Sequence, residues 1–343
     1  MPVITEQELK AKIKTNFNGI YLLYGEETFL TKSYTEKLAQ VSVDESFRDF
    51  NLKIYECENT ELSDIYESCL AVPMMAESKC VIVKEYPVGD CDDKDLESIK
   101  TLLEENPPDN TLVFAYPTVQ PKGKSFNAMV KLFNEYGCTV EFSKKTVSEL
   151  ARVLEAGAKK RDKQFDPGVA DYLVNNVGTD LNLLLNELEK VCAYADANIK
   201  RTDVDAVCIK SLESKVFDMI KDLIAGKFDS AFHRLSKLFE MREDEYMILG
   251  ALIAQYTDIY RAKAAVKAGE NAGVLTQYYS AYRKGEFRLQ KAASNGNSLT
   301  FEQLAESIEI LSEADEEMKS SSTDKKRILE QTLVKLTRAG KRK

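Results

Sequence analysis

The first 142 residues alternate short apolar runs with longer polar stretches that favour helices. The apolar runs are too brief for helices and are rich in β-branched and aromatic residues, so they predict strands. Strands that alternate with helices imply right-handed crossover connections and a largely parallel sheet. We therefore expect an α/β domain over residues 1–142, with strands at 20–24, 50–54, 81–83, 112–115 and 140–142 and helices near 27–41, 60–70, 93–105 and 123–136.

The strand signal disappears after Phe142, and capped helices follow. Thr146-Val147-Ser148-Glu149 fits a capping box, in which the Thr hydroxyl and the Glu carboxylate satisfy free amides at a helix start. Asp166-Pro167 places a capping acceptor before a proline at the first position of another helix, which would end at Gly178. We expect residues 143–209 to form a small helical domain, with an apolar stripe of Leu181, Leu184, Leu188 and Val191.

The helices lengthen from Ser211 onward. Apolar residues recur at helical spacing along them, and Thr300-Phe301-Glu302-Gln303 is another capping box. We expect a third, all-α domain over residues 210–343. Its last twenty residues, 324–343, hold eight Lys or Arg against two acids, a local charge of 8 − 2 = +6. This basic tail is either a solvated helix face with a frayed end or a patch that faces phosphates.

Composition excludes several classes of protein. The net charge of 47 − 56 = −9 argues against a chain whose whole surface grips nucleic acid, and no helix clusters Arg with Asn as a sequence-specific reader would. No run approaches the roughly 18 apolar residues of a membrane helix, and the N-terminus does not resemble a signal peptide, so we expect a soluble cytoplasmic protein. Seven cysteines without a Cys-x-x-Cys pair, and a single histidine, predict reduced thiols and no zinc site.

The loop after the first strand has the outline of a phosphate-binding P-loop. A Walker A loop needs a second glycine, followed at once by Lys and Ser or Thr. With four residues between, Gly25 is followed by Leu30-Thr31 where Gly-Lys belongs. With five residues between, Thr31-Lys32-Ser33 restores Lys-Ser but puts threonine in the glycine position. The fourth strand also ends without the carboxylate that would hold magnesium. We expect a degenerate, non-functional loop of Gly25, Thr31, Lys32 and Ser33; an NTPase with an atypical loop is the alternative.

No other catalytic pattern is present. The chain has no Gly-x-Ser-x-Gly, no His-Glu-x-x-His and no Cys/His couple that could supply a nucleophile. Asp92-Asp93-x-Asp95 is more typical of a capped turn than of a metal site. We expect no catalytic residue, no metal and no cofactor.

Five strings, in order along almost the whole chain, resemble the delta subunits of bacterial DNA polymerase III, which belong to the AAA+-like clamp loaders. They are YLLYGEETFL at 21–30, PMMAESKCVIVK at 73–84, GTDLNLLLNELEKVCAYA at 178–195, VFDMIKDLIAGKFDSAF at 216–232 and LSEADEEMKSSS at 311–322.

The resemblance implies a mechanical role within the replisome. Such a subunit binds the ring-shaped sliding clamp (the beta subunit) and opens it, or holds it open, for loading onto primed DNA. Sister ATPase subunits hydrolyse ATP, and a delta-prime subunit completes the loader. The second domain would be a lid, the third would join the collar of the complex, and primer-template DNA would be touched inside the assembly, with no membrane involved.

Residues 70–75 (LAVPMM) hold the position of the family's clamp-binding element. Pro73 cannot continue the preceding helix, so this stretch is expected to be a loop. Relatives commonly carry a large aromatic residue after the proline, whereas this chain has two methionines, which either fold onto the sheet or protrude as an apolar plug. The resemblance implies clamp contacts at Leu70, Val72, Pro73, Met74 and Met75, and we expect a DNA contact at Lys325, Lys326 and Arg327.

Overall fold

The structure is a computed structural model that describes residues 3–56, 60–279 and 298–340, together with 282, 289, 292, 293 and 295. The chain divides into two compact units, residues 1–144 and residues 145–343, which are described separately. The boundary expected between residues 209 and 210 falls inside the second unit, and the three-domain division stays a prediction.

The first unit is built on a five-stranded sheet with the order β2-β3-β4-β1-β5. Every neighbouring pair is parallel, so the expected α/β class is confirmed. The central strands are buried along almost their whole length, as a sheet covered on both faces requires. The strands are β1 (Gly19–Tyr24), β2 (Leu52–Glu56), β3 (Lys79–Lys84), β4 (Asn110–Ala115) and β5 (Cys138–Glu141).

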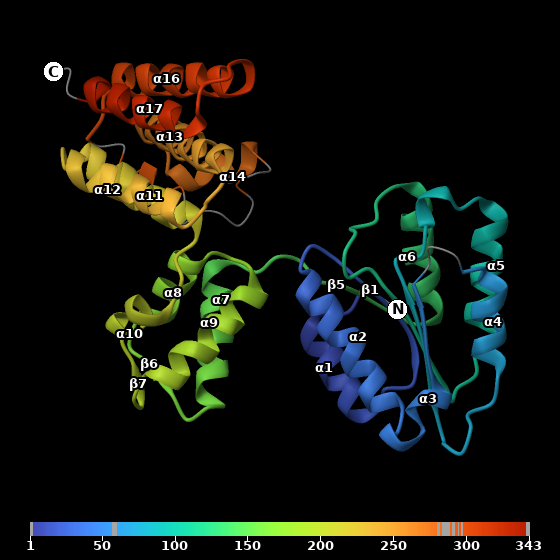
Figure 1. The fold of residues 1–343 in the computed structure, drawn as a ribbon. Helices are drawn as coiled ribbons and strands as arrows, with labels where there is room; N and C mark the ends of the chain where they lie inside the picture. The colour runs from blue at the N-terminus through green and yellow to red at the C-terminus, as the bar shows by residue number, and fades with distance from the viewer. Residues whose placement is uncertain are drawn as a thin grey trace. The chain divides into compact units, whose positions relative to one another are not determined.

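Helices cover both faces of this sheet (Figure 1). On one face, α4 (Leu62–Leu70), α5 (Asp93–Glu104) and α6 (Lys124–Tyr136) share a core with apolar side chains of the strands. On the other face lie α1 (Glu6–Thr15) and α2 (Thr28–Ser42). The shorter elements are α3 (Arg48–Asn51) and the 3₁₀ turns Glu45–Phe47 and Val88–Asp90.

Two features of this unit differ from the sequence expectation. The second strand begins at Leu52, because Phe50 and Asn51 complete the short helix α3. Asn51 Nδ2 donates to Phe47 O at 3.2 Å, which stabilises that helical turn. Helix α1 was not expected, although Thr5 and Glu8 form a capping box at its start.

The first part of the second unit is mainly helical, as expected, with α7 (Val147–Lys159), α8 (Val169–Val177), α9 (Leu181–Tyr194) and α10 (Arg201–Val207). The Thr146 capping box is confirmed, and the α9 stripe from Leu181 to Val191 is buried. Two two-residue strands were not expected: β6 (Gln164–Phe165) pairs in parallel with β7 (Asn198–Ile199).

The expected cap at Asp166 is wrong. Helix α8 begins after Gly168, whose φ of 74° is left-handed. Asp166 instead accepts a bond from Val169 N through its backbone oxygen, at 3.0 Å, so Asp166, Pro167 and Gly168 form a turn that precedes the helix.

The remaining helices share one continuous apolar core. Its members come from every long helix after residue 211, and the capping box at Thr300 is confirmed. No helix among the described residues is long and apolar enough to cross a membrane. These helices are α11 (Leu212–Ile224), α12 (Phe228–Glu240), α13 (Glu245–Lys267), α14 (Leu275–Tyr278), α16 (Phe301–Ser320) and α17 (Lys325–Ala339), with a 3₁₀ turn at Ala272–Val274.

Candidate functional site

The loop after β1 is closed by the protein's own backbone. Gly25 has a φ of 135°, and a Cβ built on it would lie 2.4 Å from the carbonyl oxygen of Phe142. Phe142 N donates to Tyr24 O at 2.7 Å, and Glu27 N donates to Phe142 O at 2.8 Å. Because Gly25 has no side chain, the backbone of Phe142, which follows β5, lies directly against this loop.

The first turn of α2 packs inward. Leu30 and Thr31 are buried, and Tyr34 stacks on Phe142 with ring centroids 5.2 Å apart. Lys32 and Ser33 are exposed. The structure thus separates the four residues of the degenerate loop: Gly25 and Thr31 are used in packing, while Lys32 and Ser33 lie on the surface.

The end of β4 also serves packing. Tyr116, which follows Ala115, is buried, and its hydroxyl donates to Tyr86 O at 3.0 Å. The position where a Walker B carboxylate would follow the strand is thus occupied by an aromatic side chain with a satisfied hydroxyl.

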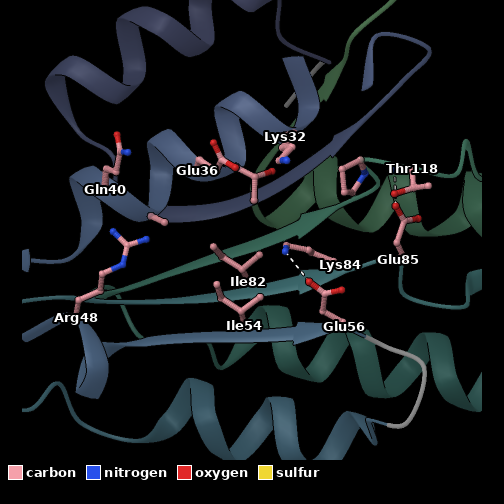
Figure 2. Close-up of a pocket in the computed structure, with 13 residues that line it drawn as sticks. Lys32, Glu36, Gln40, Arg48, Ile54, Glu56, Ile82, Lys84, Glu85 and Thr118 are labelled. Atoms are coloured by element: carbon pink, nitrogen blue, oxygen red, sulfur yellow. Dashed lines mark hydrogen bonds and ion pairs between the residues drawn. The ribbon is translucent and has the colours of Figure 1, made fainter. Parts of the chain in front are cut away.

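A hollow of about 520 Å³ lies beside α2, over β2 and β3 (Figure 2). Lys32 lines it, together with Arg48 and Lys84. These three cations face three carboxylates, and Lys84 pairs with one of them, Glu56, at 2.7 Å. The charges of the side chains that line the hollow therefore sum to zero. The remaining carboxylates are Glu36 and Glu85.

An exposed apolar loop follows α4. The helix ends at Leu70, and Ala71 N closes it by donating to Glu67 O at 3.0 Å. Pro73 is half-buried, whereas four large apolar side chains reach solvent, with exposed fractions of 43% for Leu70, 85% for Val72, 54% for Met74 and 80% for Met75. We call residues 70–75 the apolar loop.

Two buried polar side chains hold the backbone of the apolar loop. Asn51 accepts a bond from Met74 N at 2.7 Å and donates from Nδ2 to Met74 O at 2.9 Å. Lys79 Nζ donates to Ser68 O at 2.6 Å and also to Ala71 O. Burial lowers the pKa of the Lys79 ammonium, whose positive charge lies at the C-terminus of α4, where it is favoured.

Sequence reasoning missed both Asn51 and Lys79. A lysine that opens a run as apolar as Cys80-Val81-Ile82-Val83 was a usable signal, since a lysine at a buried position needs acceptors for its protons. Asn51 gave no such signal, because its partner lies far along the chain.

The basic tail begins against aromatic rings. Lys325 Nζ lies 4.3 Å from the ring centroid of Tyr246, and Lys326 Nζ lies 5.5 Å from that of Phe239. Arg327 is exposed. Residues 341–343 lie outside the described residues, so the described part of the tail ends at Gly340.

The six cysteines in the described part of the chain are thiols rather than disulfides, and four of them are buried; Cys57 lies outside the described residues. In the same part of the chain, no group of three or more His, Cys, Asp or Glu is arranged to hold a metal ion.

A parallel five-stranded α/β unit followed by a helical unit is a fold that this chain shares with a clamp-loader protein. The Bacillus subtilis DNA clamp loader delta protein shares this fold, with a TM-score of 0.65 at 23% identity over 97% of this chain and 99% of that one. The family profile described as DNA polymerase III, delta subunit, matches residues 21–143, and the profile for its C-terminal domain matches residues 213–336. A curated relative, DNA polymerase III subunit delta of Bacillus subtilis (strain 168), is 25% identical over an alignment of 333 residues, and the match covers 95% of each chain. The chain belongs to the DNA polymerase III delta-subunit family.

Proposed function

We propose that this chain is the clamp-loader subunit that binds the sliding clamp and opens its ring, or holds it open, for loading onto primed DNA. The observation that carries the proposal is the apolar loop, in which Leu70, Val72, Met74 and Met75 are exposed on a backbone that Asn51 and Lys79 hold in place. Several large apolar side chains in one exposed loop are typical of a protein-binding surface. Pro73 shapes the loop and completes the proposed contact.

Two methionines suit a contact with an irregular apolar cavity. The flexible thioether adapts its shape to the partner. Burial of each side chain contributes roughly 1.5 to 3 kcal/mol, so loss of both weakens binding by about a hundredfold or more, at about 1.4 kcal/mol per factor of ten.

The test is the double substitution Met74→Ala and Met75→Ala in the full chain. Clamp affinity is measured by surface plasmon resonance, and folding by circular dichroism. The matched control is Met241→Ala with Met247→Ala, which removes two methionines that are also exposed, at 55% and 61%, elsewhere in the chain. Unchanged clamp affinity in the folded Met74/Met75 variant would overturn the assignment. Loss of affinity in the control as well would point to a non-specific effect.

We also propose that the chain is not itself an enzyme and neither binds nor hydrolyses ATP, so that sister ATPase subunits supply the chemistry. Support comes from Phe142, whose backbone lies against Gly25, and from Tyr116, which stands where a carboxylate would follow β4. Titration calorimetry with magnesium-ATP is expected to give no binding heat. Micromolar, magnesium-dependent binding that disappears in Lys32→Ala would favour the alternative, an NTPase with an atypical loop.

Assembly and DNA contact complete the proposal. The long helices after residue 211 are proposed to form the collar with sister ATPase and delta-prime subunits, and Lys325, Lys326 and Arg327 to touch primer-template DNA. Replacing these three cations by alanine is expected to reduce the salt dependence of loader binding to primed DNA. Lys335→Ala is the control, since Lys335 pairs with Glu313 at 3.3 Å. An equal salt dependence of DNA binding in the two variants would contradict the proposed DNA contact.

A further inference from the structure

Asn51 makes a two-way connection to a single residue of the apolar loop. Its side chain is 3% exposed, and its position is the last residue of α3, directly before β2. The carboxamide accepts from Met74 N at 2.7 Å and donates to Met74 O at 2.9 Å. This is the pair of bonds that a neighbouring strand would supply, so Asn51 satisfies both polar groups of Met74 where no strand is present.

The segments that flank Met74 are also held. On the N-terminal side, Lys79 Nζ binds the carbonyl oxygens of Ser68 and Ala71, at the end of α4. On the C-terminal side, Ser78 Oγ donates to Ser42 O at 2.7 Å. The loop is therefore fixed at its entry, at its centre and at its exit by contacts with the body of the first unit.

Met75 shows the effect of this anchoring. Its φ of 55° is left-handed, a conformation that costs a residue other than glycine about 1 kcal/mol or more. Such a backbone persists only where the surrounding structure holds it. The neighbouring Met74 is bonded to Asn51, and the side chain of Met75 is 80% exposed.

We propose that Asn51 is a positioning residue that keeps the apolar loop in its binding conformation before the partner arrives. This inference rests on the proposed function of the loop as the contact with the clamp. Ordering a free backbone costs roughly 1 to 2 kcal/mol per residue, and a loop ordered in advance avoids that cost on binding. Asn51 therefore raises affinity without itself being part of the apolar contact.

The expected effect depends on the fraction of molecules in which the apolar loop has its binding conformation. Of the three hydrogen bonds that the Asn51 side chain makes, the two with Met74 hold the loop, and their loss reduces that fraction to about a tenth. Apparent affinity then falls roughly tenfold, through slower association and with little change in dissociation.

The experiment uses the full chain with Asn51→Ala. Clamp association and dissociation are measured by surface plasmon resonance, exchange of the Met74 amide by hydrogen–deuterium exchange of the unbound chain, and folding by circular dichroism. We expect faster exchange of the Met74 amide and roughly tenfold slower association. Tyr116→Phe is the control, since it removes another buried bond to the backbone within the same unit, and it is expected to leave association unchanged.

A second variant keeps the test decisive if Asn51→Ala fails to fold. Asn51→Asp retains an acceptor for Met74 N but cannot donate to Met74 O, so it is expected to slow association while the Met74 amide keeps its bond. If folded Asn51→Ala keeps the wild-type exchange rate at Met74, or if either folded variant keeps the wild-type association rate, the positioning role is overturned.

Combining Asn51→Ala with Met74→Ala and Met75→Ala separates this inference from the proposed function. If Asn51 acts through the loop, its substitution has a smaller effect once the methionines are gone, because only the remaining apolar side chains of the loop are left to position. A full additional loss of affinity would mean that Asn51 acts elsewhere, and would overturn positioning alone. Unchanged affinity in the Met74/Met75 variant would overturn the contact itself, and the positioning role with it.

Discussion

At the scale of single residues, Gly25 matters because it has no side chain, which leaves room for the backbone of Phe142 beside the loop. The glycine was recognisable in the sequence as part of a P-loop outline. Its contact with Phe142 was not, because no local pattern pairs the end of the first strand with the residue that follows the fifth. The contact between Asn51 and Met74 was likewise not predictable, because the two residues are 23 positions apart in the sequence and meet only in the folded unit.

Replacing Gly25 by alanine tests this packing directly. Gly19→Ala is a matched control, because Gly19 has the same φ of 135° but a Cβ placed on it would have nothing within 4 Å, whereas at Gly25 the Phe142 oxygen lies 2.4 Å away. Backbone strain is common to both substitutions, and only Gly25→Ala adds a backbone clash. We expect Gly25→Ala to lower the free energy of unfolding by about 1 to 3 kcal/mol more than Gly19→Ala does. Chemical denaturation followed by circular dichroism measures the difference, and equal losses would contradict the packing role.

At the scale of elements, local signals predicted helix starts and apolar runs predicted strands. The boxes at Thr146 and Thr300 lie where expected, since both partners of a capping box are three residues apart. The period-two alternation at residues 50–54 gave a wrong strand start, because a single helical turn precedes the strand. The capping signal at Asp166-Pro167 gave a wrong helix start, because a turn precedes that helix. In the candidate site, the loop was predictable from Pro73 and the helix before it, while the side chains that hold its backbone were not.

The contact between α4 and β3 gives a prediction about pH. Burial raises the pKa of the Cys69 thiol to about 11 and that of the Cys80 thiol to about 12. In the unfolded chain both thiols ionise near about pH 8.5, so below that pH their stabilising effect is complete, and it is lost as pH rises through the folded pKa values. At about pH 10.5, ionisation of each thiol stabilises the unfolded state relative to the folded state by on the order of 2 kcal/mol.

Urea unfolding at pH 8 and at pH 10.5 measures this effect. The wild-type chain is expected to lose more stability over that interval than Cys69→Ala with Cys80→Ala, because only the wild type has the two thiols whose pKa values burial raises. Parallel losses in the two proteins would show that these thiols do not contribute to the alkaline decline.

At the scale of the whole molecule, the residues of the proposed clamp contact all belong to the first unit. The apolar loop, Asn51 and Lys79 lie within residues 1–144, and the sheet that supports them has its own core. The fold class and the family were accessible from the sequence, because strand–helix alternation extends over residues 1–142 and the five ordered strings are spread along almost the whole chain. The division into units was less accessible, since helix patterns alone do not reveal which helices pack together.

Residues 1–144 alone are therefore expected to bind the clamp with an affinity within about threefold of the full chain, a difference of well under 1 kcal/mol. Residues 145–343 are expected to co-purify with sister subunits but not to bind the clamp. Surface plasmon resonance and pull-down measure the two activities, and residues 1–144 with Met74→Ala and Met75→Ala serve as the control. Lost clamp binding in a folded 1–144 fragment would show that the contact extends into the second unit.

The backbone of Phe142 beside Gly25 has a further consequence for timing. A loop that binds a nucleotide changes its conformation when the nucleotide binds and when it dissociates. Here the loop after β1 is hydrogen-bonded to Phe142 of the same chain, and this contact does not depend on a ligand. Under the proposal that no nucleotide binds here, the surface that carries the apolar loop does not change with nucleotide, and we expect its engagement of a partner to depend on neighbouring molecules that cover or uncover it.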